Sequence, residues 1–447
     1  MKKNLTAGSV FKTVLSFSLP YLLSYFLQTL YGMADLFIIG QFNGVDSTTA
    51  VSIGSQVMHM LTVMIVGLAM GGTVLIGQAV GAEKQKQASD AIGNTVTLFM
   101  ALSIVLTAGL LFTANSIVNI MSTPNEAVSE TIAYLTICFI GIPFITAYNI
   151  ISSVFRGMGD TKSPMYFIAV ACIANIALDY LFIGVFCLGA AGAALGTTLS
   201  QTISVIFSFV VILKQKTGIT LSKKNFKPHK DTMTGLLKIG IPIAFQDGFI
   251  QIAFIVITVF ANRRGVNDAA AVGIVEKVIG ILFLIPSSML QTVSALSAQN
   301  IGAGKHDRAR LTLRYAVIMS AAWGIGATIV MQLNAEPFIR LFADNAEVVR
   351  LGSQYMRGYV WDCILAGIHF SFSGYFCAYG FSVISFLHNS ISIICVRIPL
   401  SYFAARYFAE TLFPMGLASP AGSAVSVIIC ISVFVWLEKK QKNNREV

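Results

Sequence analysis

Long apolar runs recur along the whole chain, and they limit the folds that are open to it. A helix needs about 20 apolar residues to cross a bilayer, and we count twelve such runs between Thr13 and Trp436, separated by short polar breaks. The mean hydropathy of +0.76 and the charged fraction of 11 % agree with this pattern. Because a backbone in lipid must satisfy its own hydrogen bonds, we predict an all-α integral membrane protein with twelve transmembrane helices.

Basic residues gather in alternate breaks between the runs. The amino-terminal segment and every second break after it hold most of the 30 lysines and arginines, including seven lysines from Lys214 to Lys238. Cytoplasmic loops carry such an excess, so we predict a multi-pass protein of the cell membrane with both termini in the cytoplasm. The first run has no small-residue cleavage site and is expected to be retained.

The formal net charge of +10 follows from this topology, and no nucleic-acid partner is expected. We interpret the lysine-rich stretch in the middle of the chain as an anchor to anionic lipid headgroups, in preference to a ligand-binding role. Membrane lipid is therefore an expected partner.

The second half of the sequence repeats the first. One alignment of the halves, which we call the repeat register, places "GQAVGAEK" (77–84) over "AQNIGAGK" (298–305), and it also pairs Tyr134 with Tyr355 and Gly159 with Gly380. Each half holds six runs, an even number, so both halves enter the membrane from the same side. We predict two pseudo-symmetric six-helix lobes, at residues 1–213 and 233–447, joined by a cytoplasmic basic linker at residues 214–232.

Two features of the repeat concern turns and bends. The "GQAVGAEK" copies resemble a phosphate-binding loop only superficially, since Gln299 stands where a glycine is needed and no strand precedes them; we predict tight turns. Pro20 and Pro242 lie near the starts of the first and seventh runs, where a missing backbone hydrogen bond predicts a helix bend.

Carboxylates inside apolar runs mark the candidate site of the first half. Each costs about 2.5 to 3.5 kcal/mol at mid-bilayer, so a function or a partner is expected. Asp35 ends a polar stripe on one face of the first run, and Asn175 and Asp179 share a face of the fifth. The sixth run adds the hydroxyl of Thr197.

These groups form a set of hard oxygen ligands that suits sodium, whereas two neighbouring carboxylates also hold a proton. The sequence allows either ion at Asp35, Asn175 and Asp179. We prefer the proton, because a proton needs no complete coordination shell. Apart from this coupling ion, no cofactor is expected.

The second half does not duplicate this site. Positions 175 and 179 correspond to Arg397 and Ser401, and the second half has charged or polar residues of its own at Asp247, Glu276, Asp362, His369 and Arg397. One interpretation is a structural network in which Arg397 neutralises one or two of the acids; the other is a second ion or substrate site. The sequence favours neither.

Motifs of other function classes are missing from the sequence. The seven cysteines form no CxxC pair and no metal-ligand spacing with histidine. There is also no HExxH zinc pair and no GxSxG elbow. An enzyme is therefore not expected. A passive channel is not favoured either, because it would not require the pair Asn175 and Asp179 in the fifth run.

The order of several motifs resembles the multidrug and toxic compound extrusion (MATE) family. These motifs are "SLP" (18–20), "GQAVGA" (77–82), "RGMGDTKSP" (156–164), "NIALDYLFI" (175–183) and "RIPLSY" (397–402), so the resemblance covers almost the whole chain. The first-lobe motifs look closer to the DNA-damage-inducible branch. Two six-helix bundles, as predicted from the repeat, are also what this resemblance implies.

The resemblance implies a secondary active multidrug efflux transporter that exports organic cations or amphiphiles by antiport with protons or sodium ions. Two lobes would rock between outward- and inward-open states in a protein that is a monomer. The family's cation site carries over to Asp35, Asn175, Asp179 and Thr197, and its sodium-coupled branch points to Asp247 and Asp362 in the second lobe.

The alternative is a lipid-linked oligosaccharide flippase of the same superfamily. Such a protein would favour a cavity rich in basic residues to hold pyrophosphate. This chain has few basic residues at mid-membrane, chiefly Arg397 and Lys277, so cation export fits better.

Overall fold

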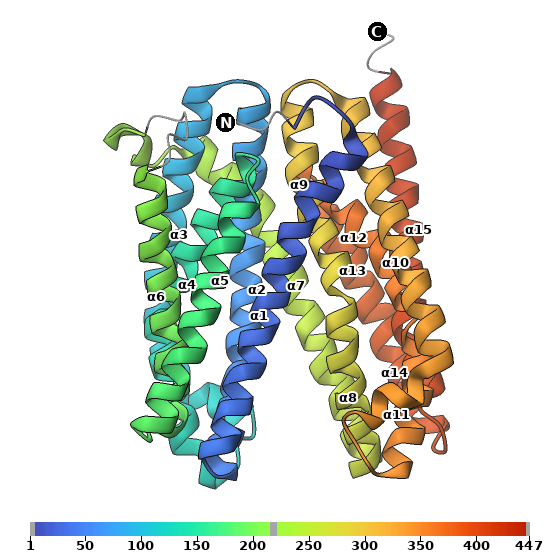
Figure 1. Ribbon diagram of the computed structural model, residues 1–447. Coiled ribbons are helices and arrows are strands. Elements are labelled where there is room, and N and C mark those ends of the chain that lie inside the picture. Colours follow the sequence, from blue (N-terminus) through green and yellow to red (C-terminus); the bar gives the residue numbers. More distant parts are fainter. Residues whose placement is uncertain (1–4, 215–220, 444–447) are drawn as a thin grey trace. The chain divides into compact units, whose positions relative to one another are not determined.

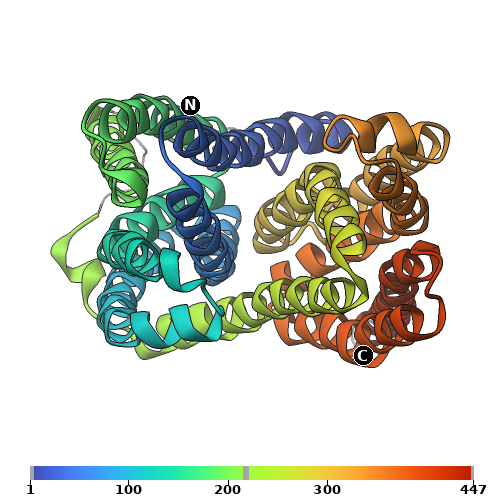
Figure 2. The ribbon, with the colours of Figure 1, turned by 90° about the horizontal axis from the view of Figure 1, so that it is seen from below.

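The computed structural model describes residues 5–214 and 221–443, with side chains up to Lys439. Within these ranges the secondary structure is entirely helical, and Figures 1 and 2 show long rods joined by short turns. Residues 215–220 of the predicted linker, and the predicted cytoplasmic residues Lys2, Lys3 and Arg445, lie outside the described residues.

The helices of the first half run from the amino terminus to the linker. They are α1 (Val10–Phe42), α2 (Val45–Gly81), α3 (Gln85–Ile120), α4 (Asn125–Gly157), α5 (Lys162–Asp179), the π-helix η1 (Tyr180–Val185), α6 (Gly189–Lys214) and the short 3₁₀ helix η2 (Lys223–Phe226).

The helices of the second half follow in the same order but are broken more often. They are α7 (Lys230–Arg264), α8 (Val266–Leu282), α9 (Leu284–Gly302), α10 (His306–Arg340), α11 (Ala346–Tyr359), α12 (Asp362–Ala378), α13 (Ser382–Ser392), the π-helix η3 (Ile393–Arg397), α14 (Ile398–Tyr407) and α15 (Phe413–Asn443).

The predicted repeat is confirmed at the level of whole helices. In the repeat register α4 corresponds to 346–378, which is the span from the start of α11 to the end of α12. In the same register α2 corresponds to 266–302, the span of α8 and α9 together. Eleven helical segments of the described residues are long and apolar enough to cross a membrane. The twelfth predicted transmembrane segment is the interrupted pair α11 and α12, which corresponds to α4 in the first half.

The turns repeat as well. Glu83 and Gly304, which are paired in the repeat register, both have positive φ, at 59° and 71°, in the turns at the ends of the motifs 77–84 and 298–305. The prediction of tight turns at these motifs is therefore confirmed. Gly159 and Gly380 form a second pair of this kind, at 94° and 78°, a backbone conformation that glycine adopts without strain.

The described chain forms two compact units. The first comprises residues 15–244 with segments 1–8 and 298–305, and the second comprises residues 245–297 and 306–447 with segment 9–14. Three of the boundaries between the units fall inside helices, within α1, α7 and α9. The predicted division at the basic linker stays a prediction.

Each unit has its own apolar core. In the first, α4 packs against α2, α3 and α6, and Tyr134, Leu135 and Phe139 of α4 are among its fully buried core residues. In the second, α11 packs against α8, α10 and α15, with Tyr355 and Met356 in the core. The helices that carry the core thus occupy corresponding positions in the repeat.

The described end of the linker is fastened to α3 by polar contacts. Asn225 Nδ2 donates to Asp90 Oδ1 at 2.7 Å, and the backbone N–H of His229 donates to Asn94 Oδ1 at 2.7 Å. Lys223, Lys224 and Lys227 remain exposed. The described end of the linker is therefore a docked segment of the first unit, and these three lysines are exposed to solvent or headgroups.

The two prolines lie inside helices. Pro20 is within α1 and Pro242 is within α7. Ser24 Oγ donates a hydrogen bond to the carbonyl oxygen of Pro20 at 2.7 Å. The bends predicted at both prolines stay predictions.

Candidate functional site

Four polar residues of the first unit meet inside the helix bundle. Asp35 lies on α1, Asn175 and Asp179 lie on the last turns of α5, and Thr197 lies on α6. The exposed fractions are 3 % for Asp35 and 0 % for Asn175 and Asp179. All four predicted cation-coupling residues are thus gathered in one interior region, reached from three helices.

The hydrogen bonding of this group, which we call the acid site, is incomplete. Thr197 Oγ1 donates to Asp35 Oδ2 at 3.1 Å. Asn175 and Asp179 are the other interacting neighbours of the Asp35 carboxyl group. Yet Asp35 Oδ1, both oxygens of Asp179 and both side-chain polar atoms of Asn175 are buried with no hydrogen-bond partner among the described residues.

Two facing carboxylates cannot satisfy each other when both are ionised, because each oxygen only accepts hydrogen bonds. A shared proton turns one carboxyl group into a donor, and a cation between them neutralises both. The unsatisfied oxygens of Asp35 and Asp179 therefore have the chemistry of a site that takes up a proton or a small hard cation. The amide oxygen of Asn175 and the hydroxyl of Thr197 supply neutral ligands beside them.

Local backbone structure places Asp179. It is the last residue of α5 and directly precedes η1, a π-helical turn from Tyr180 to Val185. Such turns are rare in helices and frequent at functional sites. Neither the composition nor the apolar periodicity of "DYLFIGV" distinguishes this turn from an ordinary α-helix, so no signal in the sequence predicts it.

The acid site has further neighbouring side chains, which the sequence patterns do not assign to it. Tyr134, Cys138 and Cys172 are electrostatic neighbours of Asp35, and the Tyr134 hydroxyl lies 3.2 Å from Ser55 Oγ. The repeat did contain a signal, since Tyr134 is paired with Tyr355 and Ser55 with Glu276. In the second unit Tyr355 is again a neighbour of the acids Glu276 and Asp362.

The second unit carries a buried ion pair. Arg397 Nη2 lies 3.0 Å from Asp362 Oδ2, and the exposed fraction of Asp362 is 0 %. Arg397 also donates to Ser423 Oγ at 3.4 Å. Asp362 is the first residue of α12, immediately after the break between α11 and α12, and Arg397 is the last residue of the π-helix η3.

The structure does not bring the other second-half candidates into this ion pair. Glu276 Oε2 accepts a hydrogen bond from Thr258 Oγ1 at 3.3 Å, and Asp247 is half-buried with Cys377 as an electrostatic neighbour. Among the residues described, neither acid forms a hydrogen bond or an ion pair with Arg397. Arg397 therefore neutralises one acid, Asp362.

His369 belongs to a separate pair of aromatic rings. It is 3 % exposed and lies edge to face with His388, with 5.7 Å between the ring centroids. Nε2 of His388 is 3.0 Å from Ser373 Oγ. No pattern in the sequence assigns His388 to a site with His369.

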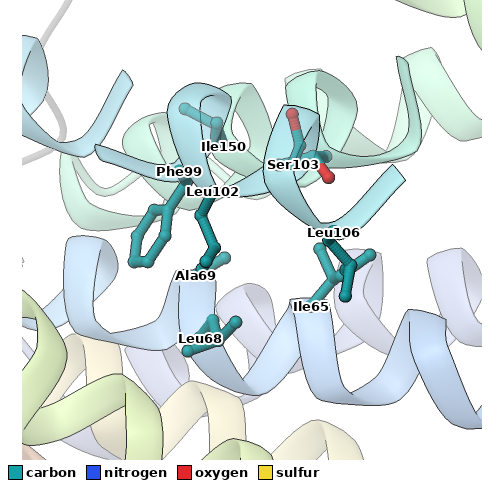
Figure 3. Close-up of a pocket in the computed structure, with 9 residues that line it drawn as sticks. Ile65, Leu68, Ala69, Phe99, Leu102, Ser103, Leu106 and Ile150 are labelled. Carbon is teal, nitrogen blue, oxygen red and sulfur yellow. The ribbon is translucent and has the colours of Figure 1, made fainter. Parts of the chain in front are cut away.

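A small apolar cavity of the first unit lies apart from the acid site. Figure 3 shows its lining from α2, α3 and α4, with Ile65, Leu68, Phe99 and Leu106 around it. Ser103 and Thr146 contribute the only hydroxyls of this lining. None of the four acid-site residues lines the cavity.

Comparison with known proteins identifies the family. The MatE family model matches residues 20–181 and again residues 242–403, so the same pattern is found once in each half. The "Probable multidrug resistance protein YoeA" of Bacillus subtilis (strain 168) is 27 % identical over 445 residues, covering 98 % of this chain and 96 % of the relative. The "Multidrug export protein MepA" of Staphylococcus saprophyticus is 24 % identical and covers 82 % of this chain and 81 % of its own length.

Solved structures show the same fold. A "multidrug resistance MATE family transporter" in an outward-facing conformation superposes with a TM-score of 0.91 at 20 % identity, covering 100 % of this chain and 99 % of that one. A transporter from Pyrococcus furiosus superposes with a TM-score of 0.89 at 20 % identity, covering 98 % and 97 %. The predicted MATE fold of twelve helices in two bundles is confirmed, and the chain belongs to the MatE family. Its placement in the DNA-damage-inducible branch stays a prediction.

Proposed function

We propose that this MatE family member is a secondary active multidrug efflux transporter of the cell membrane. It exports cationic or amphiphilic organic compounds, and the inward flow of protons or sodium ions drives the export. The relatives described as multidrug resistance and multidrug export proteins support the substrate class. The family and the eleven apolar helices support the membrane location.

The acid site is the observation that carries the coupling mechanism. Asp35 and Asp179 are buried, belong to one bundle and have unsatisfied oxygens. The binding of a proton or a cation therefore stabilises these buried carboxyl groups. Binding drives a conformational change only if the ion binds the two conformations with different affinity. The proposal is therefore that one lobe conformation holds the ion between these carboxylates and another releases it.

The roles within the site follow from the contacts. Asp179, with no hydrogen-bond partner among the described side chains, is the group that gains most from a proton or a cation. Thr197 holds one oxygen of Asp35 by donating to it, which leaves the other oxygen for the ion. Asn175 supplies a neutral amide oxygen that would complete a sodium shell and is dispensable for a proton.

Everted membrane vesicles, whose cytoplasmic face points outwards, test this function. A fluorescent organic cation is added to the medium, and its uptake into the lumen, which corresponds to export from the cell, is energised separately by a proton gradient and by a sodium gradient directed out of the lumen. Dependence on one gradient identifies the coupling ion. Full export with both gradients collapsed would contradict secondary transport, and absence of export under either gradient would contradict multidrug efflux for the tested class of compound.

The orientation forms part of the same proposal, with both termini and the linker in the cytoplasm. The chain contains a built-in control, because Cys187 is exposed in the turn before α6, while Lys214 is at the other end of that helix. With Cys395, the other exposed cysteine, replaced by serine, an impermeant thiol reagent should label Cys187 in intact cells. A cysteine at the exposed position Lys224, with Cys187 removed, should resist the reagent until the cells are opened; the reverse pattern would invert the topology.

A further inference from the structure

Gly196 of α6 lies directly against the carboxyl group of Asp179. If Gly196 carried a Cβ atom, that atom would overlap Asp179 Oδ1, and it would lie 3.2 Å from the Asp179 Cγ. The next nearest atom is the backbone nitrogen of Asp179, at 3.5 Å. The volume that a side chain at position 196 would fill is thus occupied by the carboxylate itself.

The other glycines of the same helix have different neighbours. A Cβ atom on Gly192, one turn earlier, would lie 3.1 Å from the Phe182 backbone and 3.2 Å from Leu188 Cβ. A Cβ atom on Gly189 would meet nothing closer than 3.4 Å. Gly192 serves ordinary close packing of helices, whereas at Gly196 the contact is with a functional group.

Two adjacent residues of α6 therefore act on the two carboxylates of the acid site. Thr197 donates a hydrogen bond to Asp35 Oδ2 at 3.1 Å, and Gly196 leaves the space in which Asp179 Oδ1 lies. Asp179 is fully buried, and neither of its oxygens has a hydrogen-bond partner within the described part of the chain. The polar neighbour of this carboxyl group is that of Asp35, and the shape of the surrounding atoms, those of Gly196 among them, limits how closely the two carboxyl groups approach.

We propose that Gly196 is a positioning residue of the ion site: the absent side chain fixes where the Asp179 carboxylate lies and hence how closely it approaches Asp35. This inference rests on the proposed function of the acid site. A methyl group at position 196 moves the carboxylate off the α6 backbone while every oxygen ligand stays in the protein. The distance between the two carboxylates then changes, and with it the affinity for the shared proton or cation.

The first test compares Gly196→Ala with Gly192→Ala as a matched control, since both add one methyl group to the same helix. Efflux is measured against the pH and the sodium concentration that drive it. Gly196→Ala should shift the half-maximal proton or sodium concentration at least tenfold, while Gly192→Ala, which does not touch a carboxylate, should leave it within about twofold of the original protein. Equal shifts in both variants, or no shift in Gly196→Ala, would overturn the proposal.

The second test removes transport from the readout. A double-mutant cycle combines Gly196→Ala with Asp179→Ala and measures thermal unfolding of the purified protein. Once the carboxylate is gone, the methyl group has room, so Gly196→Ala should lower the melting temperature in the Asp179 background and leave it nearly unchanged in the Asp179→Ala background. Additive shifts in the two backgrounds would show that position 196 acts through helix packing alone.

Failure of the proposed function can be distinguished from failure of the proposed role of Gly196. If Asp179→Asn transports normally, the acid site is not the coupling site and the proposed function fails, while the cycle on stability still reports whether Gly196 positions Asp179. If the cycle is additive but Asp179→Asn is inactive, the proposed function stands and the role of Gly196 is refuted.

Discussion

The two halves of this chain share one plan of helices but differ in the surroundings of their most deeply buried acids, which are Asp35 and Asp179 in the first unit and Asp362 in the second. In the first unit two carboxylates face each other with unsatisfied oxygens and no basic partner among the described residues. In the second unit Asp362 is paired with Arg397 at 3.0 Å. An uncompensated buried charge is costly, whereas a paired one is partly neutralised. The acid site therefore has the chemistry of a group that takes up and releases a cation, as the proposed function requires, whereas the ion pair of the second unit is already neutralised.

The same contrast appears in the helix that carries the core. In the first unit α4 runs unbroken through position 141, where Gly141 stands. In the second unit the corresponding helix stops at Tyr359 and resumes at Asp362. Across this break the backbone N–H groups of Cys363 and Ile364 bond to the carbonyl oxygens of Val360 and Trp361, so the charge of Asp362 is neutralised by Arg397.

The largest expected effect is on transport at Asp179. Asp179→Asn keeps the size of the side chain and removes its charge, so efflux driven by either gradient should fall to background. The protein should remain in the membrane, as checked by its amount in purified membranes. Asp362→Asn is the matched change in the second unit, and it should retain measurable efflux. Full activity of Asp179→Asn would remove the contrast between the two units.

The next effect is on stability at the ion pair. Arg397→Ala leaves the fully buried Asp362 carboxylate unpaired, which costs about 3 to 5 kcal/mol in known buried pairs. Adding Asp362→Asn to Arg397→Ala should restore part of this loss, as measured by thermal unfolding in detergent. If the two losses simply add, Asp362 and Arg397 do not depend on each other for stability, and the structural interpretation of this pair is wrong.

A smaller effect is expected at Thr197. Thr197→Ala removes the hydrogen bond to Asp35, and a hydrogen bond to a charged group is worth about 1.5 to 3 kcal/mol. The ion concentration for half-maximal efflux should therefore shift by about tenfold or more, since about 1.4 kcal/mol is a factor of ten. Thr197→Ser keeps the hydroxyl and should restore the original value. A normal ion dependence in Thr197→Ala would exclude this hydroxyl from the acid site.

The smallest effect separates sodium from protons. If sodium is the ion, it should stabilise the purified protein against heat more than potassium does, by about 1.4 kcal/mol at ten times its dissociation constant. Asn175→Ala removes a neutral oxygen ligand and should weaken this stabilisation, whereas Asp362→Asn should leave it unchanged. If protons are the ion, sodium and potassium should act alike in all three proteins. A sodium effect lost only in Asp362→Asn would move the ion site to the second unit.

The class of fold, and the four residues that the structure gathers at the acid site, could be predicted from the amino-acid sequence. Apolar runs of bilayer length require helices, since lipid offers no hydrogen bonds to an open backbone. The repeat register predicted the repeated helices and turns. A spacing of four residues puts Asn175 and Asp179 on one helix face in any α-helix, so the pairing of these two residues follows from the sequence alone.

Which side chains from different helices meet could not be predicted from the sequence and follows from the packing of the helices. It joined Arg397 to Asp362 and left Asp247 and Glu276 outside the ion pair, although all four are acids or bases in apolar runs. In the structure Gly196 also lies next to the Asp179 carboxyl group, and a π-helical turn directly follows Asp179 in the chain. The physical reason is that helix periodicity fixes the face of a residue within its own helix, whereas the rotation and separation of neighbouring helices depend on the packing of all their side chains together.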